Sequence, residues 1–318
     1  MSSTVTWPSP DSVREAERRI RPWIEETPLR WELGLERALG RPVALKCENE
    51  QAVGAFKSRG ACNAVFALDD AVASRGVATH SSGNHAAALA RAAHLRGIQA
   101  HVVMPEGAAR PKREAAAAWG AEIVTCPPTM AGRIQALARL VEATGAHVVH
   151  PYEDHHVMSG QGTVALELEA ALEPGDTLLV PLGGGGLISG MACYLAERQP
   201  AVNIVGVEPA GADDALRSWQ AGKVIAVEPN TVADGLRATI GQTNLDIVRR
   251  HVSKIITVPE EAIREAMGLI WHHSGMRVEP SAAVSVAALL DNAALAPNRA
   301  LCVLTGGNVE VNRFDVWS

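Results

Sequence analysis

Four consecutive glycines, Gly183–Gly186, form the clearest candidate for a binding site in this sequence. They follow an apolar run, Thr177–Leu182, with the composition of a buried strand, and they precede a segment with helical patterning. Glycine lets the backbone take any φ and lets a ligand approach closely. The free N–H groups of such a loop, and of the helix that starts after it, bind anions, most simply a phosphate. We therefore expect this loop to hold a phosphate-bearing ligand rather than to serve only as a tight turn.

The spacing around the glycines is also compatible with a dinucleotide as the phosphate-bearing ligand. Gly184-x-Gly186-x-x-Ser189 comes close to the dinucleotide fingerprint, and Glu208 ends the next apolar run about twenty residues further on. The third glycine of that fingerprint is missing, so a dinucleotide-dependent oxidoreductase stays an alternative. No lysine with a neighbouring serine or threonine follows the glycines, which excludes a nucleoside-triphosphate loop.

Lys57 lies in the segment Gly54–Gly60, between small and aromatic neighbours. Such neighbours predict only partial exposure, and loss of water around an amine lowers its pKa and leaves it neutral and nucleophilic. A neutral amine is what a lysine needs in order to form a Schiff base with a carbonyl group. Most lysines are solvated surface charges, so this segment alone is weak evidence. The neighbouring Arg59 is expected to be solvated.

Two polar turns follow other predicted strands. His80–His85 supplies hydroxyl, amide and imidazole groups that can bind a carboxylate. The alternative is that Ser82 or Asn84 only caps the helix that follows. Thr305–Asn308 comes after the last predicted strand, where a hydroxyl and two glycines suit close approach to a ring or form a plain turn.

Short β-branched runs alternate with longer amphipathic stretches along the chain. This alternation predicts βαβ units, and therefore parallel sheets with helices on both faces. No linker marks a boundary, so two domains would be interleaved by chain crossing rather than placed in series. The predicted strands are Val43–Cys47, Val77–His80, Ala100–Met104, Glu122–Cys126, His147–His150, Thr177–Leu182, Asn203–Val207, Lys254–Val258 and Leu301–Leu304. The predicted helices are Ala86–Leu95, Lys112–Trp119, Arg133–Thr144, Gln161–Leu172, Ile188–Arg198, Pro259–His272 and Ala282–Leu290.

The composition predicts a soluble globular chain of one or two domains. The chain has 318 residues and a net charge of −6, which argues against a nucleic-acid surface. No apolar run is long enough to span a membrane, and the first residues lack the apolar region of a secretory signal. The five scattered cysteines form no C-x-x-C pair and are expected to be reduced, buried thiols, which favours a cytoplasmic location.

Together, the motifs resemble the fold-type-II pyridoxal-phosphate enzymes in order and spacing, and within them serine racemase and the threonine and serine dehydratases. The motifs that carry this resemblance are Gly54–Gly60, Ser81–His85, Gly183–Gly186 and Thr305–Asn308, and it extends from about Arg21 to Asn312. It implies the α/β fold of the tryptophan-synthase β-subunit type, with two interleaved domains, each a mostly parallel twisted sheet flanked by helices. The large cofactor-binding domain would comprise residues 1–75 and 153–318, and the small domain residues 76–152.

The resemblance also implies a role for each motif. Lys57 would carry pyridoxal 5′-phosphate as a Schiff base and act as the base at the substrate's α-carbon, and Ser82 would act on the opposite face. Thr305 would face the ring nitrogen of the cofactor and leave it largely unprotonated, which suits elimination. The residues implied to bind the cofactor are Phe56, Lys57, Asn84, Gly183, Gly184, Gly185, Gly186, Leu187, Gly235, Glu279 and Thr305. Those implied to bind the substrate are Ser81, Ser82, Asn84, His85 and Arg133.

A cation site and an assembly follow from the same resemblance. Glu208, the carbonyl of Ala212 and Asp214 would hold Mg²⁺, or Ca²⁺ or Mn²⁺ in its place, because hard cations prefer oxygen ligands. The alternative is a solvated acidic loop. A homodimer is implied by the resemblance alone.

Departures from the family pattern gather where the substrate would bind. They are Ala55, Ala87, Tyr152 and Ala238. Arg133 matches an arginine that can meet a second carboxylate, since a guanidinium pairs with a carboxylate through two parallel hydrogen bonds. Its alternative role is a surface charge on a helix.

We therefore expect an ammonia-lyase that dehydrates a 2-amino-3-hydroxy acid to a 2-oxo acid and ammonia. Serine and threonine are candidate substrates, and so are 3-hydroxyaspartate, which Arg133 would favour, and phenylserine. The first alternative is amino-acid racemisation with Lys57 on one face and Ser82 on the other. An NAD-dependent oxidoreductase and a non-catalytic binding protein are the remaining alternatives.

Overall fold

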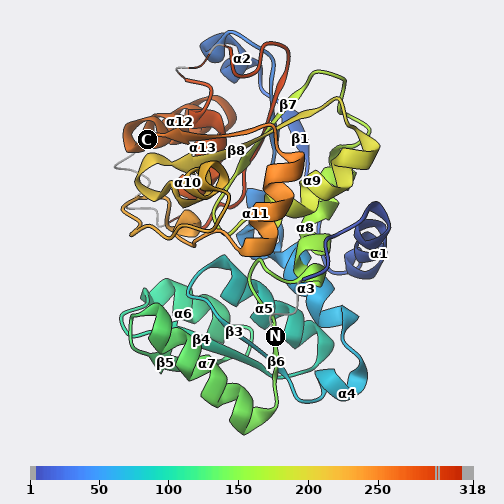
Figure 1. The fold of residues 1–318 in the computed structure, drawn as a ribbon, viewed down its shortest axis with the longest axis vertical. Coiled ribbons are helices and arrows are strands. Elements are labelled where there is room, and N and C mark those ends of the chain that lie inside the picture. The colour runs from blue at the N-terminus through green and yellow to red at the C-terminus, as the bar shows by residue number, and fades with distance from the viewer. Residues whose placement is uncertain (1–4, 291, 293, 310–318) are drawn as a thin grey trace.

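The chain forms two separate sheets in the computed structural model, which describes residues 5–290, 292 and 294–309. The resemblance was expected to end at about Asn312, and the large domain was expected to include residues 1–4 and 310–318. These ends lie outside the described residues. Figure 1 shows the two sheets one above the other, each with helices packed against it. The expected α/β class with parallel sheets flanked by helices is therefore confirmed.

The larger sheet has six strands in the order β1-β2-β10-β7-β8-β9. Its strands are β1 (Leu29–Trp31), β2 (Val43–Lys46), β10 (Ala300–Val303), β7 (Thr177–Pro181), β8 (Asn203–Pro209) and β9 (Lys254–Val258). All neighbours run parallel except β1, which pairs with β2 in the antiparallel sense. Every residue of β2, β7 and β10 is buried, as expected for a parallel sheet covered on both faces. The short edge strand β1 was not predicted, because three residues show no periodicity.

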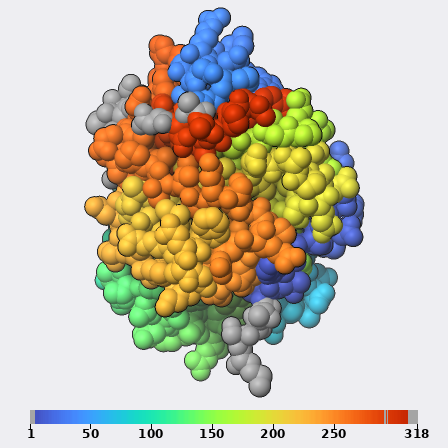
Figure 2. Space-filling view, turned by 45° about the horizontal axis from the view of Figure 1, so that its top comes forward, coloured from blue at the N-terminus to red at the C-terminus, as the bar shows by residue number. Residues whose placement is uncertain are grey.

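The smaller sheet has four parallel strands in the order β5-β4-β3-β6. They are β5 (Glu122–Cys126), β4 (Ala100–Pro105), β3 (Val77–His80) and β6 (His147–Val148). All four come from one continuous stretch of chain, whereas the larger sheet draws its strands from both sides of that stretch. In the space-filling view, the green part of the chain lies beneath the yellow and orange part that covers the larger sheet (Figure 2).

Helices connect most of the strands. They are α1 (Pro10–Ile20), α2 (Leu33–Leu39), α3 (Lys57–Ala67), α4 (Asp70–Ala73), α5 (Asn84–Arg96), α6 (Arg110–Ala117), α7 (Met130–Thr144), α8 (His155–Leu168), α9 (Gly186–Arg198), α10 (Asp214–Ala221), α11 (Gln242–His251), α12 (Glu260–Ser274) and α13 (Pro280–Ala287). Short 3₁₀ turns cover Glu48–Glu50, Ala52–Gly54, Ala210–Ala212 and Asp234–Leu236. The seven predicted helices are present with shifted ends.

The most consequential helix that the sequence did not predict is α3, which begins at Lys57. Residues 58–65 of this helix are all buried, so it lacks the polar face that makes a helical period visible. It packs between α5 and α8, at the junction of the two sheets.

The cysteines and the hydrophobic segments agree with the sequence-based expectations. All five cysteines are buried free thiols. Among the described residues, no helix has the length and apolar content needed to cross a membrane.

Candidate active site

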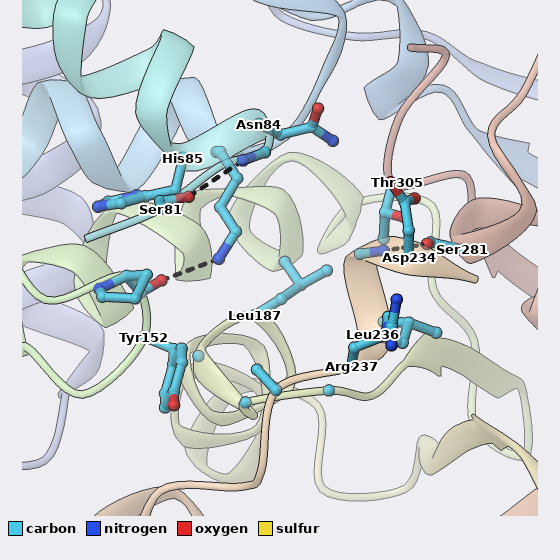
Figure 3. Close-up of a pocket in the computed structure, with 18 of the residues that line it drawn as sticks. Ser81, Asn84, His85, Tyr152, Leu187, Asp234, Leu236, Arg237, Ser281 and Thr305 are labelled. Carbon is cyan, nitrogen blue, oxygen red and sulfur yellow. Dashed lines mark hydrogen bonds between the residues drawn. The ribbon is translucent and has the colours of Figure 1, made fainter. Parts of the chain in front are cut away.

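A cavity of about 240 Å³ lies where the carboxyl ends of strands from both sheets meet. Its walls include the turn after β3, the glycine loop after β7 and the turn after β10 (Figure 3). The structure thereby brings together every residue that was implied to bind cofactor or substrate. These are Phe56, Lys57, Ser81, Ser82, Asn84, His85, Arg133, Gly183, Gly184, Gly185, Gly186, Leu187, Gly235, Glu279 and Thr305.

The residues singled out as departures divide into two groups. Tyr152 and Ala238 line the cavity. Ala55 and Ala87 are buried and are not among its lining residues, so the expectation that they shape the substrate pocket is wrong. Ala55 instead pairs with Gly306 in an isolated bridge that joins two walls of the site.

Several lining residues were not anticipated, because they lie in loops, in a short 3₁₀ turn or at the starts of helices, where no chemical motif marks them. They are Met130, Pro151, Asp234, Leu236, Arg237 and Ser281. Each of them lies within three positions of a residue that was expected at the site, and that proximity was the available signal.

The Lys57 amine projects into the cavity from the first turn of α3. Its Nζ donates a hydrogen bond to the carbonyl of Pro151 at 2.8 Å and lies 5.1 Å from the centre of the Phe56 ring. Burial lowers the pKa of Lys57 to about 8, against the opposing charge of Glu279. A substantial neutral fraction near pH 8 makes the amine available for covalent attachment to a carbonyl carbon.

The glycine loop is built so that only backbone borders the cavity. Gly185 has φ +90°, a conformation that favours glycine. A Cβ on Gly184 would lie 2.4 Å from a ring carbon of Tyr152, so a side chain has no room there. The helix α9 begins at Gly186, and the first N–H groups of a helix have no partner within the helix. A glycine loop and a helix N-terminus beside a buried amine fit pyridoxal 5′-phosphate: the loop would hold the phosphate, and Lys57 would bind the aldehyde.

The turn after β3 does not serve as a side-chain cap. The N-cap of α5 is Gly83, and no side chain caps this helix, so the alternative role for Ser82 or Asn84 is wrong. Asn84 instead donates through Nδ2 to both carboxylate oxygens of Glu279, at 3.0 and 3.1 Å. Ser81 and Ser82 both line the cavity.

Glu279 also lines the cavity and carries an unusual pKa. Burial, followed by the charge of Asp234, raises the pKa of Glu279 to about 7. The Oδ1 of Asn84 accepts from Asn308 at 3.0 Å, so the Asn84 amide is held on both sides. Figure 3 shows Thr305, Asp234 and Ser281 across the cavity from Ser81 and His85.

The histidines of the site are neutral near pH 7. Burial and the charge of Lys57 lower the pKa of His85 well below its usual value, and burial and His80 lower that of His150 to about 4. The Nδ1 of His150 accepts from the N–H of Glu153 at 2.8 Å. The permanent positive charges at the walls are therefore those of arginine side chains.

Two arginines line the cavity. The Nε of Arg133, on α7, is buried and has no hydrogen-bond acceptor among the described residues. Burial, and then the charge of Arg133, lower the pKa of His80, so these two side chains are close enough to interact. Arg237 is exposed and donates to the carbonyl of Pro229 at 3.3 Å. The alternative of Arg133 as a plain surface charge is disfavoured by its place at the cavity wall.

The implied cation ligands are not among the residues that line the cavity, and they lie near the end of β8, in the following 3₁₀ turn and at the start of α10. Glu208 and Asp214 are almost completely buried, so the alternative of a solvated acidic loop is wrong. Burial, followed by the charge of Asp214, raises the pKa of Glu208 to about 8. No cluster of three or more histidine, cysteine, aspartate or glutamate side chains suits a metal within the described part of the chain. The implied set has two carboxylates, and its third ligand would be the buried Ala212 backbone.

Comparisons with known proteins identify the family of this chain. The β-hydroxyaspartate dehydratase of Paracoccus denitrificans (strain Pd 1222) is 44% identical over 309 residues, 96% of this chain and 98% of that protein. The serine racemase of Arabidopsis thaliana is 43% identical over 309 residues, 94% of this chain and 93% of that protein. The solved structure of maize serine racemase has a TM-score of 0.94 at 40% identity, covering 98% of this chain and 97% of that one. The model of the family described as pyridoxal-phosphate dependent enzymes matches residues 20–306, and this chain belongs to that family.

Proposed function

We propose that this protein is an ammonia-lyase that dehydrates a 2-amino-3-hydroxy acid, and that its substrate is 3-hydroxyaspartate. The relatives of nearly equal similarity carry out different chemistry, so their identities alone do not select one reaction. The observation that carries the choice of substrate is Arg133, a cavity arginine whose buried Nε has no acceptor among the described residues.

A second carboxylate on the substrate would supply the missing acceptor. Carboxylates and guanidinium groups match in geometry and form charge-assisted hydrogen bonds, which are stronger than neutral ones. His80 stays neutral beside Arg133, so it adds no permanent charge of its own. Serine and threonine have no group that could use Arg133 in this way.

The reacting groups of the chain can divide the chemistry between them. When bound, pyridoxal phosphate supplies the electron sink that makes the substrate's α-proton acidic. The Lys57 amine, held at the carbonyl of Pro151, would accept that proton. The substrate hydroxyl takes up a proton, which balances the one removed from the α-carbon, and leaves as water. The released enamine then takes up water to give the 2-oxo acid and ammonia. Ser81 and the N–H groups of its turn would bind the α-carboxylate, a role that the position of Ser81 at the cavity wall supports.

Replacement of Arg133 by leucine tests this assignment. The variant is expected to lose roughly 10²-fold in kcat/KM for 3-hydroxyaspartate, which corresponds to one or two charge-assisted hydrogen bonds. Its kcat/KM for serine is expected to change little, because serine has no second carboxylate. Release of 2-oxo acid is measured for each stereoisomer of 3-hydroxyaspartate, serine, threonine and phenylserine.

The matched control for this experiment lies on the same helix. Arg139 is exposed on α7, and Arg139→Leu is expected to leave both substrates unaffected. Equal losses on 3-hydroxyaspartate and serine in Arg133→Leu would refute the assignment of the second carboxylate to Arg133.

Racemisation is the second candidate, because Ser82 lines the same cavity as Lys57. A proton delivered from the face opposite the lysine would return the enantiomer instead of releasing water. Chiral chromatography of the same reactions measures enantiomer against 2-oxo acid. Accumulation of enantiomer without 2-oxo acid would overturn the proposed elimination.

We also propose that Glu208, Asp214 and the Ala212 carbonyl hold Mg²⁺ or a similar cation. Burial, followed by the charge of Asp214, raises the pKa of Glu208, and a bound cation would favour the ionised form of both carboxylates. Both carboxylates are already aimed by backbone N–H groups, which donate to Glu208 from Ala215 at 3.0 Å and to Asp214 from Ile240 at 2.8 Å.

Addition of Mg²⁺ to chelator-treated protein is expected to raise its thermal unfolding temperature. A site that binds only the folded state gains about 2.7 kcal/mol when the free cation is a hundredfold above its dissociation constant. Glu208→Gln is expected to abolish the response, whereas Glu265→Gln, an exposed change on α12, retains it. A response that persists undiminished in Glu208→Gln would place the cation elsewhere.

The remaining proposals concern organisation. We retain the division into a large domain of residues 1–75 and 153–318 and a small domain of residues 76–152. The origin of all four strands of the smaller sheet within residues 77–148 supports it. A homodimer in the cytoplasm stays a proposal that rests on the family resemblance and the reduced thiols.

A further inference from the structure

The first turn of α11 holds an asparagine that joins two walls of the cavity. Asn244 is completely buried. Its Nδ2 donates to the carbonyl of Gly184 at 2.7 Å and to the carbonyl of Tyr152 at 3.1 Å. One acceptor belongs to the glycine loop, and the other belongs to the segment that follows β6.

The contact with Gly184 decides where the next N–H group points. In a trans peptide the carbonyl and the following N–H point in opposite directions. The carbonyl of Gly184 faces α11, where it accepts from Asn244 and also from the N–H of Gly241 at 3.3 Å. The N–H of Gly185 therefore points away from α11, toward the side on which the loop borders the cavity. Asn244 thus orients a donor of the expected phosphate site without touching the ligand.

The contact with Tyr152 ties the lysine side of the site to the same helix. Pro151, which precedes Tyr152, accepts the hydrogen bond from the Lys57 amine. This segment has a second attachment to α11, because Glu153 accepts from the N–H of Thr243 at 2.9 Å. The segment that contacts Lys57 is thus held by two separate residues, Asn244 and Thr243. The Gly184 carbonyl also has two donors, but the bond from Asn244, at 2.7 Å, is shorter than the bond from Gly241, at 3.3 Å.

The chemistry of the contact requires an amide donor at residue 244. Both partners are carbonyls, which only accept, so the side chain must supply two N–H groups from one atom. An aspartate would have the same shape but would place an oxygen against two carbonyl oxygens. The Oδ1 of Asn244 has no donor among the described residues, so the amide orientation follows from the Nδ2 contacts.

We propose that Asn244 is a positioning residue for the cofactor phosphate, acting through the Gly184–Gly185 peptide. This inference rests on the family membership and on these contacts, and it does not depend on which amino acid is the substrate. It predicts a loss that is selective for ligands carrying a phosphate.

The test compares pyridoxal 5′-phosphate with pyridoxal, which has the same ring and aldehyde but no phosphate. Both are titrated into cofactor-free protein, and binding is followed by absorbance of the attached aldehyde. In Asn244→Ala and Asn244→Asp, the ratio of the two affinities is expected to fall roughly tenfold, as the loss of about one net hydrogen bond implies. The affinity for pyridoxal should change by less than about twofold, since the segment at Lys57 keeps its bond to Thr243.

A matched control removes a different buried amide. Asn63 is also completely buried and donates through Nδ2 to the carbonyl of His156 at 2.7 Å, away from the cavity. Asn63→Ala should lower thermal stability without altering the ratio of affinities. If Asn244→Ala does not fold, Asn244→Asp and Asn244→Ser, with a single hydroxyl donor, provide the measurement. An unchanged ratio in a folded variant, or equal losses for both ligands, would overturn the proposal.

Discussion

Replacement of Lys57 by alanine is expected to lower kcat by roughly 10⁴-fold, the upper end of what a positioned proton-transfer group contributes. The amine is placed at the cavity by α3 and by the Pro151 carbonyl, and no other lysine lines the cavity within the described residues. In the proposed mechanism, its loss would remove both the covalent attachment of the cofactor and the base at the α-carbon. Steady-state release of 2-oxo acid measures the effect.

A second readout separates attachment from catalysis. Borohydride reduction should fix the cofactor on the unchanged protein but not on Lys57→Ala, as peptide mass spectrometry would show. Because burial lowers the pKa of Lys57 to about 8, the rate of attachment to cofactor-free protein should rise as the pH passes through that value. The exposed Lys223 supplies the control Lys223→Ala. Reduction that fixes the cofactor on another lysine would contradict the assignment.

Replacement of Arg59 by methionine is expected to lower the free energy of unfolding by about 3–5 kcal/mol, the usual cost of removing one partner of a buried ion pair. Arg59 is completely buried, so the expectation that it is solvated is wrong. Its guanidinium donates to both oxygens of Glu48 at 2.8 Å and also pairs with Glu167. Without it, the fully buried carboxylate of Glu48 would lose its principal cation.

The loss of unfolding free energy in Arg59→Met is expected to depend on pH because of Glu48. Burial opposes ionisation of Glu48, but Arg59 outweighs burial, and the net effect lowers the pKa of Glu48 below 4.5. A lowered pKa stabilises the fold above pH 4.5, and this contribution disappears as the pH falls through the folded-state value. The difference between Arg59→Met and the unchanged protein should therefore be largest near neutral pH and shrink in acid.

Chemical denaturation at several pH values measures this difference. The control is Arg110→Met, which removes an exposed pair with Glu114 and should change the unfolding free energy by less than about 1 kcal/mol. A change of similar size in Arg59→Met would show that the buried network does not stabilise the fold.

Lys57 and Arg59 are two residues apart and illustrate what could be predicted. The lysine was found because its small and aromatic neighbours predict partial burial, and the other motifs lie at matching distances along the chain. The burial of Arg59 was missed because its partners, Glu48 and Glu167, are separated from it in sequence and belong to other elements. The strands could be predicted because buried parallel strands are continuous apolar runs in the sequence. Helix α3 was missed because residues 58–65 are all buried, so the sequence shows no helical period there.

Residue types and spacing were sufficient to predict the α/β class and to single out the glycine loop and Lys57, because apolar runs, consecutive glycines and the distances between motifs can be read along the chain. The family resemblance had implied Arg133 at the substrate, but the place of Arg237 at the same cavity, and the burial of Glu208 and Asp214, emerged only from the folded chain. So did the bridge made by Asn244, whose two acceptors are 60 and 92 residues away along the sequence. Such contacts depend on how separate elements pack, and no local pattern records which carbonyl a buried amide will meet.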